Sequence, residues 1–208
     1  GRSDDRVGQE GGKGMIGVIG AGAFGTALAI ALGRDGHEVR LWARDADHVA
    51  TMAQSRRNEG RLPGVLFPET VSVTANIDDL TTAEALILSV PMQALRGFLA
   101  LHHARIDGIP LVACCKGIDL STLKGACALM SDACPNSTVA VLTGPSFAAD
   151  IAKGLPTALT LASTNGEALQ RLLSTPDLRL YRSTDVIGAE LGGALKNVIA
   201  IAAGVVIG

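Results

Sequence analysis

Three glycines at fixed spacing follow a short apolar run near the start of the chain, and they constrain the fold more than any other feature. The run Met15–Ile19 predicts a buried strand, and Gly20, Gly22 and Gly25 then form a G-x-G-x-x-G pattern. A run of helix formers and a second apolar strand follow within 26–42. In this strand–turn–helix–strand order, the pattern indicates a dinucleotide-binding turn rather than a flexible loop.

Each of the three glycines meets a different physical requirement of such a turn. Gly20 allows a tight turn directly after the strand, and Gly25 lets the helix pack closely on that strand. Gly22 leaves room for a pyrophosphate to approach the backbone. The pyrophosphate would then lie at the helix N-terminus, where free N–H groups and the helix dipole favour an anion. We therefore predict an α/β protein with a Rossmann-type, doubly wound and mostly parallel sheet.

The residues after the second strand bear on which dinucleotide is bound. Arg44 and Asp45 are adjacent there. An acidic side chain in this region binds the ribose 2′-hydroxyl of NAD, whereas an arginine accommodates the 2′-phosphate of NADP. Both types are present, so either NAD or NADP fits the sequence, and Arg44 favours tolerance of NADP. A solvated surface arginine is the alternative.

Two further turns follow predicted strands and suit a ligand, because ligands in such folds bind outside the carboxyl ends of the strands. Lys116 comes directly after the apolar run 111–115 and is placed to meet an anion, although a surface lysine is the ordinary alternative. The turn 144–147 follows the run 139–143, and its N–H groups and the Ser146 hydroxyl suit a phosphate. An ordinary Gly-Pro turn is equally compatible with this pattern.

The last segment predicts a helix over 185–207 that carries Lys196. Gly192 and Gly193 precede this lysine by one turn, and a glycine inside a helix costs about 1 kcal/mol relative to alanine. We therefore expect another part of the chain to approach the helix backbone there. Desolvation among small residues lowers the pKa of a lysine and suits it to general-base catalysis. The alternative is a lysine whose charged end reaches water.

The remaining pattern divides the chain into three parts. We expect a disordered leader over 1–14, a dinucleotide-binding domain over 15–184, and the start of an all-helical second domain over 185–208. An apolar stripe runs along the last helix, which is too short and interrupted for a convincing membrane span. We therefore expect the chain to be a fragment cut within that helix. The stripe consists of Leu191, Leu195, Val198, Ile199 and Ala202.

Several local expectations concern the rest of the first domain. Asp47 is predicted to cap a helix over 47–56, and Ser121 to cap one that ends near Ala133. Residues 58–68 hold two glycines and two prolines and are predicted to form a loop. His102 and His103, at the end of a helix that begins after Pro91, are expected to face water.

Charge and cysteine content exclude other classes of protein. The net charge is −2, and no cluster of basic residues with interleaved aromatics occurs, which argues against a nucleic-acid partner. The four cysteines have neither C-x-x-C spacing nor a histidine at zinc spacing, so we expect no metal site. Free thiols are typical of a reducing, cytoplasmic location, and the polar first residues do not form a signal peptide.

The motifs together resemble those of NAD(P)-dependent glycerol-3-phosphate dehydrogenases, most closely the bacterial type. They occur in the family's order over 15–208, and the last is the most specific. The matching stretches are Gly20-Ala-Gly-Ala-Phe-Gly-Thr-Ala-Leu-Ala29, Gly36-His-Glu-Val-Arg-Leu-Trp42, Ser89-Val-Pro91, Cys115-Lys-Gly-Ile118, Thr143-Gly-Pro-Ser-Phe-Ala148 and Glu190-Leu-Gly-Gly-Ala-Leu-Lys-Asn-Val-Ile-Ala200.

This resemblance implies reversible hydride transfer between NAD(P)H and dihydroxyacetone phosphate, which yields sn-glycerol 3-phosphate for phospholipid synthesis. It implies that Lys196 donates and accepts the proton, that Asn197 helps to hold the catalytic constellation, and that Lys116 touches both cofactor and substrate. The implied substrate contacts are Lys116, Gly144, Ser146 and Lys196. The implied cofactor contacts are Gly20, Gly22, Ala23, Phe24, Gly25, Arg44, Pro91, Lys116 and Ala148, with Ala23 in place of the serine often found there.

The family continues with a helical domain that supplies an Arg-Asn pair for the substrate phosphate, and no such pair follows here. Since a phosphate without its arginine loses a charge-assisted contact, we expect the chain alone to lack turnover. A homodimer is one oligomeric state that the resemblance allows. Two other functions stay open at this point: another hydroxyacid or sugar-acid dehydrogenase of similar build, and a nucleotide-binding module without catalysis.

Overall fold

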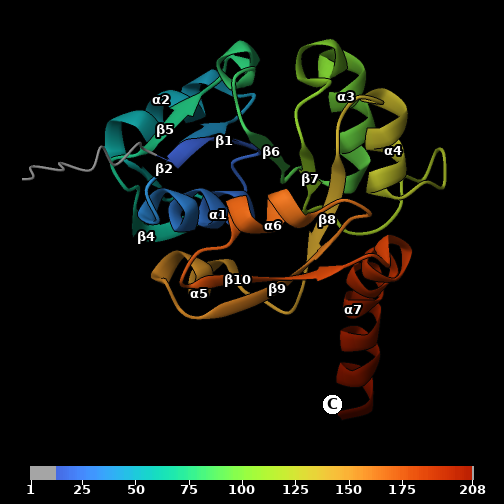
Figure 1. Cartoon of the computed structure of the whole chain (residues 1–208). Coiled ribbons are helices and arrows are strands. Elements are labelled where there is room, and N and C mark those ends of the chain that lie inside the picture. The colour runs from blue at the N-terminus through green and yellow to red at the C-terminus, as the bar shows by residue number, and fades with distance from the viewer. Residues whose placement is uncertain (1–12, 208) are drawn as a thin grey trace, which may run out of the picture.

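An eight-stranded sheet forms the centre of the protein (Figure 1). The computed structural model describes residues 13–207. The strand order is β10-β9-β8-β7-β6-β1-β2-β5, and neighbouring strands are parallel except for the antiparallel pair β8–β9. This confirms the predicted mostly parallel sheet. The strands are β1 (Lys13–Ile19), β2 (His37–Trp42), β5 (Val71–Thr74), β6 (Ala85–Leu88), β7 (Leu111–Ala113), β8 (Val139–Thr143), β9 (Thr157–Ala162) and β10 (Leu178–Ser183).

Helices cover both faces of the sheet, as a doubly wound fold requires. One buried apolar cluster holds residues of α1, α2, α5 and α6, and the other holds residues of the short 3₁₀ helix η1, of α3 and of α4. Figure 1 shows α1 and α6 together on one side and α3 and α4 on the other. The helices are α1 (Ala23–Arg34), α2 (Ala46–Ser55), η1 (Ile77–Leu80), α3 (Met92–Ile106), α4 (Ala126–Ala133), α5 (Ala148–Lys153), α6 (Glu167–Leu173) and α7 (Val186–Ile207).

The chain reverses its direction of winding around β1. From β1 it proceeds to β2 and β5 on one side, and it then returns to place β6 on the other side of β1. The carboxyl ends of β1 and β6 therefore border the point where the two halves of the sheet diverge. Ligands of open α/β sheets bind in the crevice at this position.

The turn between β1 and α1 is built on contacts that only glycine allows. Gly20 has a φ of +107°, which side chains disfavour. A Cβ on Gly25 would lie 2.2 Å from the Gly20 carbonyl oxygen and 2.9 Å from Ser89 Cβ. Helix α1 thus begins in direct backbone contact with the turn and with the strand end at β6. Both predicted reasons for these two glycines are confirmed.

Four local expectations differ from the structure. Helix α2 is capped by Asp45 rather than Asp47, because the Asp45 carboxylate accepts from the backbone N–H groups of residues 47 and 48. Helix α4 begins at Ala126 with Gly125 as its N-cap, so Ser121 caps no helix. The expected loop 58–68 contains most of a two-stranded antiparallel sheet, and β1 begins at Lys13 rather than Met15. The two short strands are β3 (Arg57–Asn58) and β4 (Leu62–Leu66).

Helix α7 projects away from the sheet (Figure 1). Its first turn packs on the core through Val186 and Ala189, and the Asp185 carboxylate accepts from the Gly188 N–H at 2.9 Å. Two residues of the predicted stripe, Leu191 and Leu195, are half exposed on this helix. No helix within residues 13–207 combines the length and apolar character needed to cross a lipid bilayer.

The replacement Gly25→Ala tests the turn. Because its Cβ would meet backbone rather than a flexible side chain, we expect the free energy of unfolding to fall by about 1–3 kcal/mol or more. Urea denaturation would measure this change. Gly60→Ala is the matched control, since a Cβ there meets no atom of the described residues within 4 Å. Equal stability of the two variants would contradict the proposed packing.

Candidate functional site

A cleft of about 1090 Å³ lies at the carboxyl ends of the central strands. The residues that line it come from the ends of β1, β2, β6, β7 and β8, together with helix α3. Positions far apart in the sequence are thereby brought to one place. Among the predicted site residues, those that line the cleft are Gly20, Gly22, Ala23, Phe24, Arg44, Pro91, Lys116 and Gly144.

The glycine turn forms the floor of this cleft at the start of α1. Gly22 is the N-cap of α1, and a Cβ on it would meet no atom of the described residues within 4 Å. The space above Gly22 is therefore open, in contrast to the packed surroundings of Gly25. A helix N-terminus facing an open cleft offers unpaired N–H groups and a positive dipole end to an anionic group.

Two arginines line the cleft. Arg44 follows β2, and Arg61 comes from the turn between β3 and β4; both side chains are exposed and line the cleft. The neighbouring Asp45 uses one carboxylate oxygen to cap α2. Arg61 was not among the predicted site residues, because its segment had no pattern beyond loop-forming residues. Its place beside the cleft depends on how this segment is held.

Asn58 holds that segment against the glycine turn. Its side chain is buried, and its amide donates to the Ala21 carbonyl at 2.9 Å and to Thr26 Oγ1 at 2.8 Å. The Asn58 amide oxygen lies 3.0 Å from Nε2 of His48, which lines the cleft from α2. A buried amide with its polar atoms paired fixes its neighbours, because breaking any of these bonds leaves an unsatisfied group.

An aromatic cluster lines the wall of the cleft next to α3. The ring centroid of His102 lies 4.8 Å from that of Phe98 and 6.0 Å from that of Trp42. The expectation that His102 faces water is therefore wrong, whereas His103 is exposed as expected. His102 follows Phe98 by four positions, so the two side chains lie on the same side of the helix. Its Nδ1 is buried and has no hydrogen-bond partner among the described residues.

Ser146 lies in the turn after β8, two positions beyond the cleft-lining Gly144. Ser146 Oγ is buried without a hydrogen-bond partner among the described residues. A buried hydroxyl without a partner is costly, and a ligand group is one way to satisfy it. Ala148 begins α5 and packs against the core, so its side chain contributes to the scaffold. Neither residue is among those that line the cleft, unlike Gly144.

Helix α7 passes close to the same strand ends. A Cβ on Gly193 would lie 2.8 Å from Thr143 Oγ1 and 3.9 Å from Lys116 Cγ. The expected close approach to the helix backbone is thus confirmed at Gly193, while Gly192 meets no atom of the described residues within 4 Å. Glu190 also fastens the helix, because its carboxylate accepts from the Cys127 N–H of α4 at 2.8 Å.

The predicted residues Lys196 and Asn197 belong to α7, but their side chains lie outside the described part of the structure. Lys196 follows Gly193 by three positions, so the two residues share one face of the helix. The backbone therefore places Lys196 one turn beyond the contact with β8. The sequence motifs alone did not predict that α7 contacts the end of β8.

The four free cysteines do not contribute a nucleophile. Burial raises the pKa of Cys115 and of Cys134 to about 11 and that of Cys127 to about 12, and it raises the pKa of Cys114 further. Such thiols are protonated at neutral pH, and the thiolate is the reactive form. Within residues 13–207, no group of three or more histidine, cysteine or acidic side chains is arranged to hold a metal ion.

The parallel sheet, the glycine turn and the cleft at the switch point define a dinucleotide-binding Rossmann domain. Comparison with known families is more specific. Residues 15–169 match the family described as NAD-dependent glycerol-3-phosphate dehydrogenase N-terminus, and residues 185–208 match the corresponding C-terminus. The chain belongs to the NAD-dependent glycerol-3-phosphate dehydrogenase family.

Individual relatives agree with this assignment. The chain is 59% identical to a glycerol-3-phosphate dehydrogenase [NAD(P)+] of Paracoccus denitrificans and 56% identical to one of Ruegeria sp., in each case over 93% of this chain. A crystal structure of glycerol-3-phosphate dehydrogenase from Coxiella burnetii superposes with a TM-score of 0.86 at 34% identity, over 92% of this chain and 60% of that chain. The chain spans about 60% of the length of these relatives.

His102 provides a test of the aromatic wall. Desolvation lowers the pKa of its imidazole below the ordinary value of 6.5, repulsion by Arg105 lowers it further, and Asp78 opposes the shift. We expect NMR to show a titration midpoint below 6.5 in the folded chain and near 6.5 in urea. The stability contributed by neutral His102 is then present above the unfolded pKa and is lost as the pH falls through the folded pKa. A folded midpoint above 6.5 would contradict this environment.

Proposed function

We propose that this chain forms the cofactor-binding part of a cytoplasmic enzyme that interconverts sn-glycerol 3-phosphate and dihydroxyacetone phosphate with NAD or NADP. The product would supply phospholipid synthesis. The observation that carries the proposal is the contact of Gly193 with Thr143 and Lys116, because it brings the helix of Lys196 to the dinucleotide cleft. A homodimer and the absence of a nucleic-acid partner are part of the same proposal.

The residues of the cleft fit a dinucleotide. The open space above Gly22 suits a pyrophosphate, since a side chain there would occupy it. The aromatic and apolar wall formed by Trp42, Phe98 and Leu101 suits an adenine ring, which needs flat apolar surfaces more than charges. Lys116 and Gly144 line the end of the cleft where β7 and β8 finish. Seven of the cofactor contacts implied by the family resemblance line this cleft, whereas Gly25 and Ala148 do not. The seven are Gly20, Gly22, Ala23, Phe24, Arg44, Pro91 and Lys116.

Bound NAD(P)H supplies a hydride to the carbonyl carbon of the substrate. Reduction of a ketone also requires a proton at the carbonyl oxygen, and we assign its transfer to the Lys196 ammonium group, with Asn197 helping to hold the catalytic constellation. In the reverse direction, neutral Lys196 removes the hydroxyl proton. Lys116 stabilises negative charge where cofactor and substrate meet, and the Ser146 hydroxyl gains the partner that it lacks among the described residues.

Arg44 and Arg61 favour NADP at the adenosine end. Both line the cleft, and one carboxylate oxygen of Asp45 is already engaged in capping α2. An acidic group that selects NAD needs its oxygens for the ribose hydroxyls, whereas two arginines suit a 2′-phosphate. We therefore propose that the enzyme uses NADP as well as NAD.

The replacement Lys196→Ala tests the central assignment in a full-length protein that contains this sequence. We expect turnover of dihydroxyacetone phosphate to fall by about 10²–10⁴-fold, the usual contribution of a general acid–base group, with NADPH binding retained. Lys153→Ala is a control, since Lys153 is an exposed lysine at the end of α5. Unchanged turnover would remove Lys196 from the mechanism. A wild-type protein that binds NADPH but prefers 2-keto acids would contradict the proposed substrate.

The replacement Arg44→Ala tests the cofactor preference. We expect the dissociation constant of NADPH to rise about tenfold, the size of one charge-assisted hydrogen bond, with little change for NADH. Fluorescence titration of the reduced cofactors would measure both constants. The control Arg57→Ala removes a nearby arginine that pairs with Glu59 and does not line the cleft. Equal weakening of NADPH and NADH by Arg44→Ala would contradict contact with the 2′-phosphate.

A further inference from the structure

The segment between β7 and α4 carries Lys116 but forms neither helix nor strand over residues 114–125. Two of its residues have unusual backbone conformations, since Gly117 has a φ of +99° and Leu123 a φ of +59°. A non-glycine residue with positive φ is held there by its surroundings. The position of Lys116 therefore depends on what holds this segment, which we call the lysine loop.

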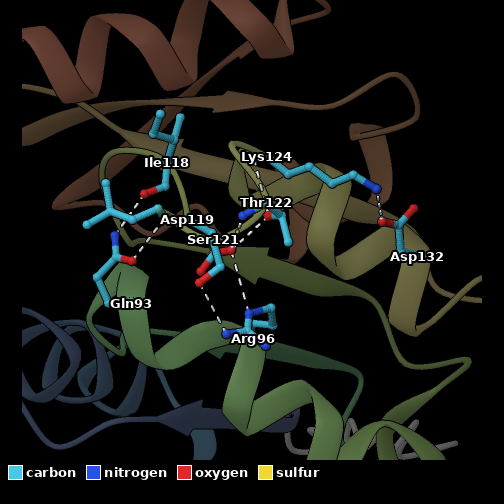
Figure 2. Close-up of polar contacts among 9 residues, drawn as sticks. Gln93, Arg96, Ile118, Asp119, Ser121, Thr122, Lys124 and Asp132 are labelled. Carbon is cyan, nitrogen blue, oxygen red and sulfur yellow. Dashed lines mark hydrogen bonds and ion pairs between the residues drawn. The ribbon is translucent and has the colours of Figure 1, made fainter.

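Gln93 of α3 holds the lysine loop through both ends of its amide group (Figure 2). Its Nε2 donates to the Ile118 carbonyl at 2.8 Å, and its Oε1 accepts from the Leu120 N–H at 3.1 Å. The side chain thus pairs with the backbone on both sides of Asp119. Two hydrogen bonds from one planar amide fix the orientation of the loop as well as its distance from the helix.

Asp119 closes the loop at the same place. Its buried carboxylate accepts from the N–H and the hydroxyl of Thr122, at 2.9 and 2.7 Å, and its backbone bonds to residues 123 and 124. Arg96, one turn after Gln93 on α3, lies 3.6 Å from the Asp119 carboxylate and 3.4 Å from the Ser121 hydroxyl. The pKa of Asp119 is lowered chiefly by the hydrogen bond from the Thr122 hydroxyl. Arg96 is among the smaller contributions that lower it further. Figure 2 shows both α3 side chains pointing to this loop.

Helix α3 also forms a wall of the dinucleotide cleft. Ala94, Gly97, Phe98 and Leu101 line the cleft, and Pro91 lines it directly before the helix begins. Gln93 and Arg96 lie between the cleft-lining residues along the same three turns of α3. One rigid helix therefore touches the cofactor site with one side and fixes the lysine loop with the other.

From this arrangement we propose that Gln93 and Arg96 are positioning residues that place Lys116 relative to the bound dinucleotide. The proposal rests on the proposed function, because it assigns Lys116 to the meeting point of cofactor and substrate. We expect loss of the Gln93 amide to leave the fold intact, since this side chain is exposed, but to loosen the loop backbone at residues 118 and 120. A misplaced charged group costs catalysis even when all reacting groups are present.

The test is a double-mutant cycle of Gln93→Ala and Lys116→Ala in a full-length protein that contains this sequence, measured as kcat/KM for dihydroxyacetone phosphate with NADPH. We expect Gln93→Ala alone to lower kcat/KM by about tenfold, mainly through a higher KM for the substrate, as expected for one or two lost hydrogen bonds. In the Lys116→Ala background, the same change should alter kcat/KM less than about twofold. Gln93→Glu, which keeps the acceptor but loses the donor, should lie between wild type and Gln93→Ala.

The control is Lys124→Ala, which removes the ion pair of the same loop with Asp132 of α4 and leaves both α3 contacts intact. We expect Lys124→Ala to keep the wild-type kcat/KM. We also expect the thermal unfolding midpoint of Gln93→Ala to stay near that of the wild type. An equal loss of kcat/KM with and without Lys116, or no loss from Gln93→Ala, would overturn the inference. Failure of the wild-type protein to reduce dihydroxyacetone phosphate would instead refute the proposed function. Arg96→Ala, scored in the same cycle, gives a second independent measure.

Discussion

The contact between Gly25 and the Gly20 carbonyl is the constraint on which the remaining site depends. At this distance no side chain fits between the first turn of α1 and the end of β1, so the helix begins directly on the strand end. Its N-terminal N–H groups are thereby directed toward the crevice between β1 and β6. A small displacement of α1 would separate these groups from the rest of the cleft, which is built from other strands.

The cleft is assembled by elements that each perform two tasks. Helix α3 lines the cleft and also fastens the lysine loop, and Asn58 links the glycine turn to the segment of Arg61. Helix α7 is attached at two points, through Glu190 to the start of α4 and through Gly193 to the end of β8. Rigid elements shared between sites hold functional groups more precisely than free loops. This sharing explains why polar side chains outside the cleft bear on its geometry.

The surfaces that line the cleft differ in character. Trp42, Phe98 and His102 form an aromatic wall, and two exposed arginines stand near it. Where β7 and β8 end, Lys116 and the backbone after β8 add a cation and N–H groups to the lining. An apolar wall binds a flat ring, whereas cations and N–H groups bind phosphates and developing oxyanions. The cleft therefore combines surfaces suited to a flat ring with surfaces suited to an anion.

The sequence by itself determined the parallel α/β fold, because apolar runs of strand length alternate with helical runs and the glycine pattern has one structural context. It also predicted that Lys116 and the glycine turn lie together at one edge of the sheet, and both line the cleft there. Only the tertiary structure decided the roles of Asn58, Arg61, His102 and Gln93. The hydrogen bonds of Asn58 and Gln93 join residues 10 to 37 positions apart, and His102 packs on Trp42, which lies 60 positions earlier. Such contacts follow from how the packed elements meet, and local sequence preference does not encode them.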